Sequence, residues 1–202
     1  MLQLDITRQN EAVERVLEAT TNSRHRYLLQ AYLRHRYLES AGRYKEIFDP
    51  QLTVEHPVYR FSLIGQPRMT LEGREQVEAL YQYWTDTDQC VFYVEAETVA
   101  VGDHMIVGRG ISYQQTLGSA LAAAGIDADP TAMYLTKSQI AMIWPYDDQC
   151  RLLGEDVWEY DDTQREYLKL DPADVLTADQ AGTLLAPFIK PLPDFSDLLL
   201  PA

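Results

Sequence analysis

Residues 90–117 read CVFYVEAETVAVGDHMIVGRGISYQQTL, and this stretch decides the fold because it encodes two long strands joined by a tight turn. β-branched and aromatic residues recur on both sides of Gly102 and Asp103, which form the turn. A second pair of strand-like runs follows, MYLTKSQIAMIWP at residues 133–145 and CRLLGEDVWEY at residues 150–160. The two hairpins predict an antiparallel meander of at least four strands.

Helical periodicity precedes these strands. An apolar stripe that begins at Val13 predicts a first helix, a second is expected from Ser23 to about Ala41, and RYKEIF at residues 43–48 suggests a short third one. LTVEHPVYRFSLIG at residues 52–65 is strand-like, with Pro57 implying an edge or a break, and GREQVEALYQYW at residues 73–84 returns to helical spacing. The order of elements therefore predicts an α+β domain over residues 1–161.

A C-terminal extension, residues 162–202, follows the expected end of the sheet at Asp161. Thr177 and Gln180 fit a capping box for a short helix. The extension carries apolar residues that would be poorly solvated if they were free, so it is expected to pack on its own domain or on a partner subunit. They are Leu184, Leu185, Phe188, Ile189 and Leu198 to Leu200. The small-residue segment GSALAAAGIDADPTA, residues 118–132, could form a lid, a short helix, a disordered segment or a tolerated surface insertion, and the sequence leaves these alternatives open.

Composition excludes several classes of partner. A formal charge of -14 in 202 residues repels phosphate backbones and anionic lipid headgroups, so neither nucleic acid nor a membrane surface is expected as a partner. No apolar run approaches the roughly 20 residues that span a bilayer, and the N-terminus lacks a signal-peptide pattern, which together predict a cytoplasmic protein. Cys90 and Cys150 are expected to be reduced core residues. The four histidines are scattered at positions 25, 35, 56 and 104, so we predict no metal site.

His35 stands out within RHRYLLQAYLRHRY, residues 24–37. At 100° per residue it lies in the middle of the apolar arc formed by Leu28, Ala31, Tyr32 and Leu38, and is therefore a polar group directed at the core. Burial should lower its pKa and keep the imidazole neutral, which suits a hydrogen-bond donor or a base. The alternative is a purely structural imidazole whose nitrogens are satisfied by neighbours.

The order of elements over about residues 10–160 resembles the nuclear transport factor 2-like superfamily, whose fold is a curved antiparallel sheet wrapped as a cone around N-terminal helices. This superfamily includes ketosteroid isomerases, scytalone dehydratases, limonene epoxide hydrolases and SnoaL-like polyketide cyclases. The segment AGRYKEIFDPQLTVEHPV, residues 41–58, resembles an isomerase segment that ends in Val-Glu-Asp-Pro-Val. The resemblance implies that His56 replaces the Asp that acts as general base. It places the oxyanion tyrosine at His35 or Tyr32, and the late-strand protonated Asp near Ile140, where no acid is present.

Strand alternation adds to these candidates. His56 alternates with Leu52 and Val54, which predicts that it shares their face. Either Glu155 or Asp156 must point inward on the last strand, where a carboxylate would orient a catalytic histidine. Arg109 alternates with apolar residues and is expected to have an internal or interfacial partner. The other side chains expected to line a substrate pocket are Tyr59, Phe61, Tyr81, Trp84, Tyr113, Trp144 and Trp158.

Two classes of function follow from the resemblance. The first is a cofactor-independent isomerase, dehydratase or cyclase that transfers a proton on a small hydrophobic, carbonyl-bearing or polycyclic substrate, with His56 as base. The second is a non-catalytic module of the same fold that binds a small ligand or dimerises; a homodimer is expected in either case. An epoxide-hydrolase-like site that uses Arg109 and Asp156 is a third possibility. An interior filled by the extension or by large aromatic residues would favour the non-catalytic class.

Overall fold

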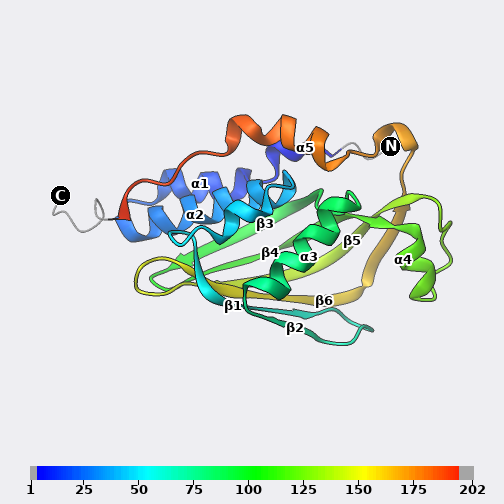
Figure 1. Cartoon of the computed structure of the whole chain (residues 1–202), viewed down its shortest axis with the longest axis horizontal. Coiled ribbons are helices and arrows are strands. Elements are labelled where there is room, and N and C mark those ends of the chain that lie inside the picture. The colour runs from blue at the N-terminus through cyan, green and yellow to red at the C-terminus, as the bar shows by residue number, and fades with distance from the viewer. Residues whose placement is uncertain (1–3, 196–202) are drawn as a thin grey trace.

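The computed structural model describes residues 4–195 as a curved six-stranded sheet that is covered on one face by helices (Figure 1). The sheet has the order β2-β1-β6-β5-β4-β3. Its strands are β1 (Thr53–Ser62), β2 (Met69–Glu72), β3 (Phe92–Gly102), β4 (Met105–Leu117), β5 (Met133–Pro145) and β6 (Leu152–Lys169). The helices are α1 (Glu11–Ala19), α2 (Ser23–Ser40), α3 (Arg74–Asp86), α4 (Gly118–Ala123) and α5 (Ala178–Leu185). The described residues also form four 3-10 segments: η1 (Ile6–Arg8), η2 (Tyr44–Phe48), η3 (Pro172–Asp174) and η4 (Ala186–Phe188).

Strands β3, β4, β5 and β6 form the antiparallel meander that the two hairpins predict. β1 joins it by pairing parallel to β6, and β2 pairs antiparallel to β1 at the edge, so the sheet as a whole is mixed. The predicted end of the last strand at Asp161 is wrong, because β6 continues to Lys169. The acidic stretch after Asp161 lacks an apolar alternation, yet its backbone pairs with β5 from Glu166 to Lys169. The expected domain boundary therefore falls inside a strand.

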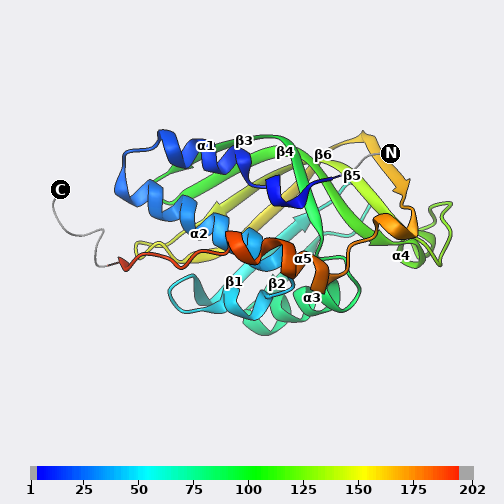
Figure 2. The ribbon, with the colours of Figure 1, turned by 90° about the horizontal axis from the view of Figure 1, so that it is seen from above.

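The helical layer forms as its periodicity predicts. α2 spans Ser23–Ser40 and crosses the sheet in the view from above (Figure 2), with Asn22 capping its first turn. Its apolar arc, which includes Leu28 and Leu38, is fully buried. Cys90 and Cys150 are buried and unbonded, as expected. None of the helices between residues 4 and 195 is long and apolar enough to cross a membrane.

Large aromatic residues fill the space between helices and sheet. Tyr32 and Trp144 meet edge to face with ring centroids 4.6 Å apart. Such pairs add about 0.5–1.5 kcal/mol to the stabilisation from burial alone. Six aromatic side chains of this core expose 3% or less of their surface: Tyr27, Tyr32, Tyr59, Tyr81, Trp144 and Tyr146. The interior of the cone is thus packed with rings.

The C-terminal extension packs on its own domain. The predicted capping box between Thr177 and Gln180 is present at the start of α5. Beyond α5 the chain runs along α2 (Figure 2), where Phe195 meets Tyr27 edge to face at 5.8 Å. Ile189 also packs against the core, whereas Leu184 stays 45% exposed. The expectation for Leu198 to Leu200 lies outside the described residues.

Residues 118–132 adopt the short-helix alternative. α4 packs at the end of β4, away from the helical layer (Figure 1). The segment closes on itself because Gly118 N–H donates to the carbonyl of Ala132 at 2.8 Å. A Cβ at Gly118 would come within 1.9 Å of the Asp129 carbonyl oxygen, so this approach requires glycine. The segment does not cover the interior between helices and sheet.

A buried ion pair links the helical layer to the sheet. A β-bulge between Glu95 and Thr98, with Ala96 at φ 51, turns Glu97 into the interior. Arg36 Nη1 donates to both carboxylate oxygens of Glu97 at 2.9 Å. The two side chains expose only 2% and 1% of their surface.

We expect Arg36→Met to lower the free energy of unfolding by about 3–5 kcal/mol, because it leaves the Glu97 carboxylate buried without its counter-charge. Urea unfolding measures the change. The matched control is Arg60→Met, which breaks the exposed pair with Asp156 and should cost at most about 1 kcal/mol. Equal losses in the two variants would contradict a special role for the buried pair. Adding Glu97→Gln to Arg36→Met should restore part of the loss.

Candidate functional site

Five titratable side chains meet in the interior and form what we call the acid–base cluster: His35, Glu39, Tyr59, Tyr81 and Glu155. His35 and Glu39 are one turn apart on α2, so both project from the same side of the helix. Tyr81 comes from α3. Tyr59 and Glu155 are register partners on the parallel strands β1 and β6. Four elements thus direct ionisable groups to one place between the helices and the sheet.

His35 is at the centre of this cluster. Its Nε2 lies 3.1 Å from the Tyr81 hydroxyl and 4.0 Å from Glu39 Oε2. The imidazole also packs edge to face on Trp144 with ring centroids 4.6 Å apart. Burial, and then the positive charge of Arg36, lower the pKa of His35 to about 3. The imidazole is therefore neutral near pH 7, where one ring nitrogen donates and the other accepts.

Two carboxyl groups share this interior. Burial raises the pKa of Glu39 to about 8, while the nearby Arg36 guanidinium opposes that rise. The pKa of Glu155 is raised well above its usual range, first by burial and then by the charge of Glu39. Two carboxyls that interact in this way do not both ionise at neutral pH, so the cluster retains at least one exchangeable proton. Groups with such perturbed pKa values concentrate at functional sites.

The phenols of the cluster stay neutral. Burial raises the pKa of Tyr59 and of Tyr81 well above 10, and the Glu155 carboxyl raises both further. The Tyr81 hydroxyl is near enough to act on the pKa of Tyr59, yet the Tyr59 hydroxyl makes no hydrogen bond of acceptable geometry among residues 4–195. The Trp144 indole N–H is also unsatisfied in that part of the chain. An unsatisfied buried polar group costs about 1–3 kcal/mol and in native proteins calls for a functional or solvent partner.

Several residues expected from the sequence come together here. His35, Tyr59, Tyr81 and Glu155 belong to the cluster, and Trp144 lies against it. Tyr32 is adjacent, with its hydroxyl 3.5 Å from Arg36 Nη1. Phe61 and Trp84 pack edge to face beside the core, with ring centroids 6.3 Å apart. Ile140 is a plain core residue, 7% exposed, and the buried acid of this site is instead Glu155 on the next strand.

The prediction that His56 faces the interior is wrong. His56 is exposed and lies next to Gly73 at the start of α3. The register of β1 against β6 shifts between Thr53 and Val58, which ends the alternation that begins at Leu52. This irregularity faces Gly154, where a Cβ would approach the Val58 carbonyl oxygen to 1.8 Å. His35 and His56 therefore do not share an environment.

Three other expected residues lie outside the interior, so the expectation that they line one pocket with His35 is wrong. Asp156 points to the outer face of the sheet and pairs with Arg60 at 3.1 Å. Arg109 also lies on the outer face, where its Nε donates to the Tyr160 hydroxyl at 3.1 Å. Trp158 is 38% exposed. Each of the three occupies the alternate strand positions that face away from the helices.

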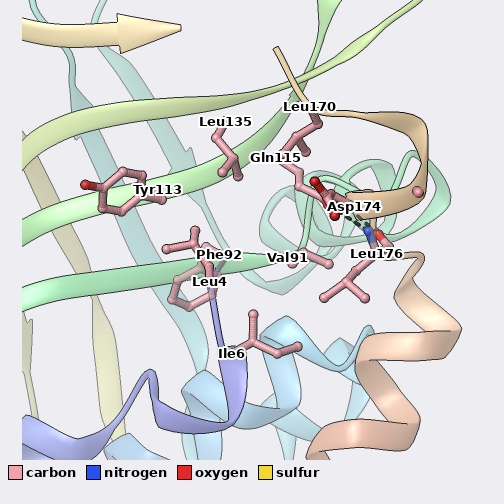
Figure 3. A pocket seen from close by; sticks show the side chains of 11 residues that line it. Leu4, Ile6, Val91, Phe92, Tyr113, Gln115, Leu135, Leu170, Asp174 and Leu176 are labelled. Carbon is pink, nitrogen blue, oxygen red and sulfur yellow. Dashed lines mark hydrogen bonds between the residues drawn. The ribbon is translucent and has the colours of Figure 1, made fainter. Parts of the chain in front are cut away.

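Tyr113 belongs to a separate small pocket near the N-terminus (Figure 3). Its hydroxyl donates to Glu95 Oε2 at 2.9 Å. The walls are mostly apolar and come from η1, β3, β5 and the segment before α5. The side-chain amide of Gln115, which lines the pocket, is hydrogen-bonded to the backbone carbonyl and N–H of Leu176. Its volume is about 170 Å³, and no member of the acid–base cluster lines it.

Sequence reasoning missed Glu39, Arg36 and Glu97. Glu39 was detectable, since it follows the core-directed His35 by four residues and so shares its side of the helix. Arg36 and Glu97 could not be paired from the sequence, because only the bulge at Ala96 turns Glu97 inward. Among residues 4–195, no group of three or more His, Cys, Asp or Glu side chains could hold a metal ion.

The variant Glu39→Gln tests whether burial keeps the Glu39 carboxyl protonated. Between the ordinary pKa of 4.5 and about 8, the folded state binds this proton and the unfolded state does not, so stability is lost as pH rises through that window. His35 has the opposite effect, but only between about 3 and 6.5. We therefore expect the wild type to lose stability from pH 6.5 to pH 8 and Glu39→Gln to lose less, since Glu155 alone then supplies this dependence.

Urea unfolding at pH 6.5 and pH 8 provides the measurement. Glu55→Gln is the matched control, because Glu55 is an exposed carboxylate on β1. It should leave the pH dependence of the wild type unchanged. A Glu39→Gln protein that loses as much stability as the wild type would show that Glu39 titrates normally.

Comparison with known proteins is informative only at the level of structure. No family model matches the sequence, and no curated protein matches it. A nuclear transport factor 2-like protein from Anabaena variabilis superposes with a TM-score of 0.50 at 11% identity, over 70% of this chain and 92% of that one.

Two further solved structures are similar over most of their length. The epoxide hydrolase/cyclase-like enzyme SalBIII, which acts in pyran ring formation in salinomycin, gives a TM-score of 0.46 at 11% identity, over 76% of this chain and 97% of that one. A putative polyketide cyclase from Xanthomonas campestris pv. campestris gives 0.46 at 12% identity, over 72% and 96%. Identities this low establish fold alone. The chain has the cone-shaped α+β fold of the nuclear transport factor 2-like superfamily, as its order of elements predicts.

Proposed function

We propose that this protein catalyses cofactor-independent proton transfer on a small, apolar, carbonyl-bearing molecule, and that the acid–base cluster is its active site. The observation that carries the proposal is the buried carboxyl pair, in which Glu39 raises the pKa of Glu155. A core that served packing alone would gain stability from apolar residues at both positions. The fold hosts enzymes and binding proteins alike, so the argument rests on these side chains.

Glu39 is the better base of the two carboxyls. It lies on the same helix as Arg36, whose charge opposes the rise in its pKa, and it therefore ionises near pH 8. As a carboxylate it removes a proton from the carbon next to the substrate carbonyl, and the electron pair moves to the carbonyl oxygen. Returning the proton to another carbon completes an isomerisation; loss of a leaving group or ring closure gives a dehydratase or a cyclase.

The developing oxyanion requires neutral donors. Glu155 retains its proton, and the Tyr59 hydroxyl has no hydrogen bond within residues 4–195, so both are available to donate to that oxygen. If His35 donates its Nε2–H to the Tyr81 oxygen, Tyr81 can direct its own proton at Tyr59 and leave the Tyr59 proton for the substrate. His35 would then be a positioning residue. His56, the base implied by the isomerase resemblance, takes no part.

Glu155→Gln tests the site with 2-naphthol, an apolar phenol whose hydroxyl imitates an enol. We expect 2-naphthol to raise the melting temperature of the wild type and to do so much less in Glu155→Gln, because the amide cannot share a proton with the bound oxygen. Differential scanning fluorimetry measures both shifts. His56→Ala is the control and should behave like the wild type, since His56 is exposed.

Activity provides the second measurement. With a β,γ-unsaturated ketone as substrate, kcat/KM should rise with pH towards about 8, where Glu39 ionises, and Glu39→Gln should abolish the rise. Loss of activity in His56→Ala with full activity in Glu39→Gln would overturn this assignment.

A second candidate function is a non-catalytic module of the same fold, and the filled interior favours it. The six buried aromatic residues and the packing of Phe195 on Tyr27 occupy the space that a substrate would need. In this case the chain binds a small hydrophobic ligand elsewhere or dimerises. Phe195→Ala separates the candidates: a site that opens beneath the extension should bind 2-naphthol faster in this variant, whereas a permanently filled core should show only lower stability.

A further inference from the structure

A second hollow lies on the outer face of the sheet, opposite the face that carries the helices. Its volume is about 470 Å³, within the range of ordinary small-molecule sites. Ala96, Ala100, Gly108 and Gly110 line its floor: the two alanines present only small side chains, and the two glycines present backbone, since their Cβ positions face the interior. Arg109 and Tyr160 stand at its rim.

Strand register brings the polar side chains of this hollow together. Thr98 on β3 is the partner of Arg109 on β4, and Ile111 on β4 is the partner of Gln139 on β5. Tyr160 on β6 completes the group through its bonds to Arg109 and Gln139. The same bulge that turns Glu97 inward resets the alternation of β3, so that Thr98 faces outward. Four neighbouring strands therefore contribute to one site.

Hydrogen bonding among these side chains leaves mainly donors available. Arg109 Nε donates to the Tyr160 hydroxyl at 3.1 Å, and that hydroxyl donates to Gln139 Oε1 at 2.8 Å. The terminal guanidinium nitrogens of Arg109 and the amide nitrogen of Gln139 remain for a ligand. The guanidinium also lies over the Tyr160 ring, 4.8 Å from its centroid, which fixes its plane.

Arg109 has no acidic partner within the described part of the chain. None of the ion pairs between residues 4 and 195 includes it, although the chain carries 31 acidic residues and a net charge of -14. The planar guanidinium of Arg109, which has no acidic partner among these residues, is suited to bind a carboxylate through two parallel hydrogen bonds.

We propose that this hollow is a binding site for a flat aromatic carboxylate. The carboxylate pairs with the terminal nitrogens of Arg109 and accepts a hydrogen bond from the side-chain amide nitrogen of Gln139. The aromatic ring lies on the floor of alanine and glycine beside Tyr160. The site is separate from the acid–base cluster, because the sheet lies between them. This site depends on Arg109 and on the bulge in β3, and it is independent of the proposed reaction.

Isothermal titration calorimetry of the full-length protein with 2-naphthoate tests the proposal. We expect saturable binding by the wild type that weakens as salt is added. Arg109→Met should weaken it about tenfold or more, since hydrogen bonds to a charged group are lost. Arg109→Lys should retain part of the affinity, because the charge remains without the planar fork. Arg60→Met is the matched control, since Arg60 is an exposed arginine on the same face that already pairs with Asp156, and it should bind as the wild type does.

Three results would overturn the proposal: no binding of 2-naphthoate by the wild type, equal binding of uncharged 2-naphthamide, or equal loss in Arg109→Met and Arg60→Met. Analytical ultracentrifugation adds a further decisive outcome. A wild-type dimer that becomes a monomer in Arg109→Glu, and that does not bind 2-naphthoate, would mean that a second copy of the chain occupies this face instead.

Discussion

The buried ion pair between Arg36 and Glu97 is the interaction on which the rest of the structure depends. It joins α2 to β3 inside an apolar interior, where neither charge can be removed alone without a large loss of stability. Arg36 also lies over the rings of Tyr32 and Phe92, and its Nη2 is 3.5 Å from the backbone carbonyl of Gln9. One side chain thus fixes the helix, the sheet and the N-terminal segment relative to one another.

The same positive charge controls the proton chemistry of the cluster. Arg36 adds to the burial that lowers the pKa of His35, and it opposes the burial that raises the pKa of Glu39 and Glu155. Without it, burial would hold a proton on both carboxyls over a wider pH range, and neither would serve as a base near neutrality. A residue needed for stability therefore also shifts the pKa values of His35, Glu39 and Glu155. If the proposed reaction takes place at this cluster, activity and stability cannot be tuned independently at position 36.

The sequence predicts the regular parts of this structure well, because their signals are local. The spacing of apolar residues defines α2 and places His35 correctly, and the turn at Gly102 and Asp103 defines the β3–β4 pair. Two of the errors occur where a strand departs from regular alternation. Alternation predicts the wrong face for His56 because β1 shifts register before Val58, and it ends β6 too early because backbone pairing with β5, rather than apolar side chains, extends that strand. Alternation predicts that either Glu155 or Asp156 on β6 points inward, but it does not say which. Only the observed register places Glu155 inside.

The bulge in β3 shows why such irregularities matter for function. A regular strand would place Glu97 on the same face as Glu95, so the carboxylate that Arg36 requires would lie among outward-facing residues. By inserting one residue at Ala96, the strand directs Glu97 into the interior and Thr98 to the outer surface beside Arg109. The left-handed conformation of Ala96 costs on the order of 1 kcal/mol, which is less than the loss expected when one partner of the buried ion pair is removed. A single strained residue thereby supports a charged interior on one face of the sheet and a donor-lined hollow on the other, which explains how one sheet carries two chemically different surfaces.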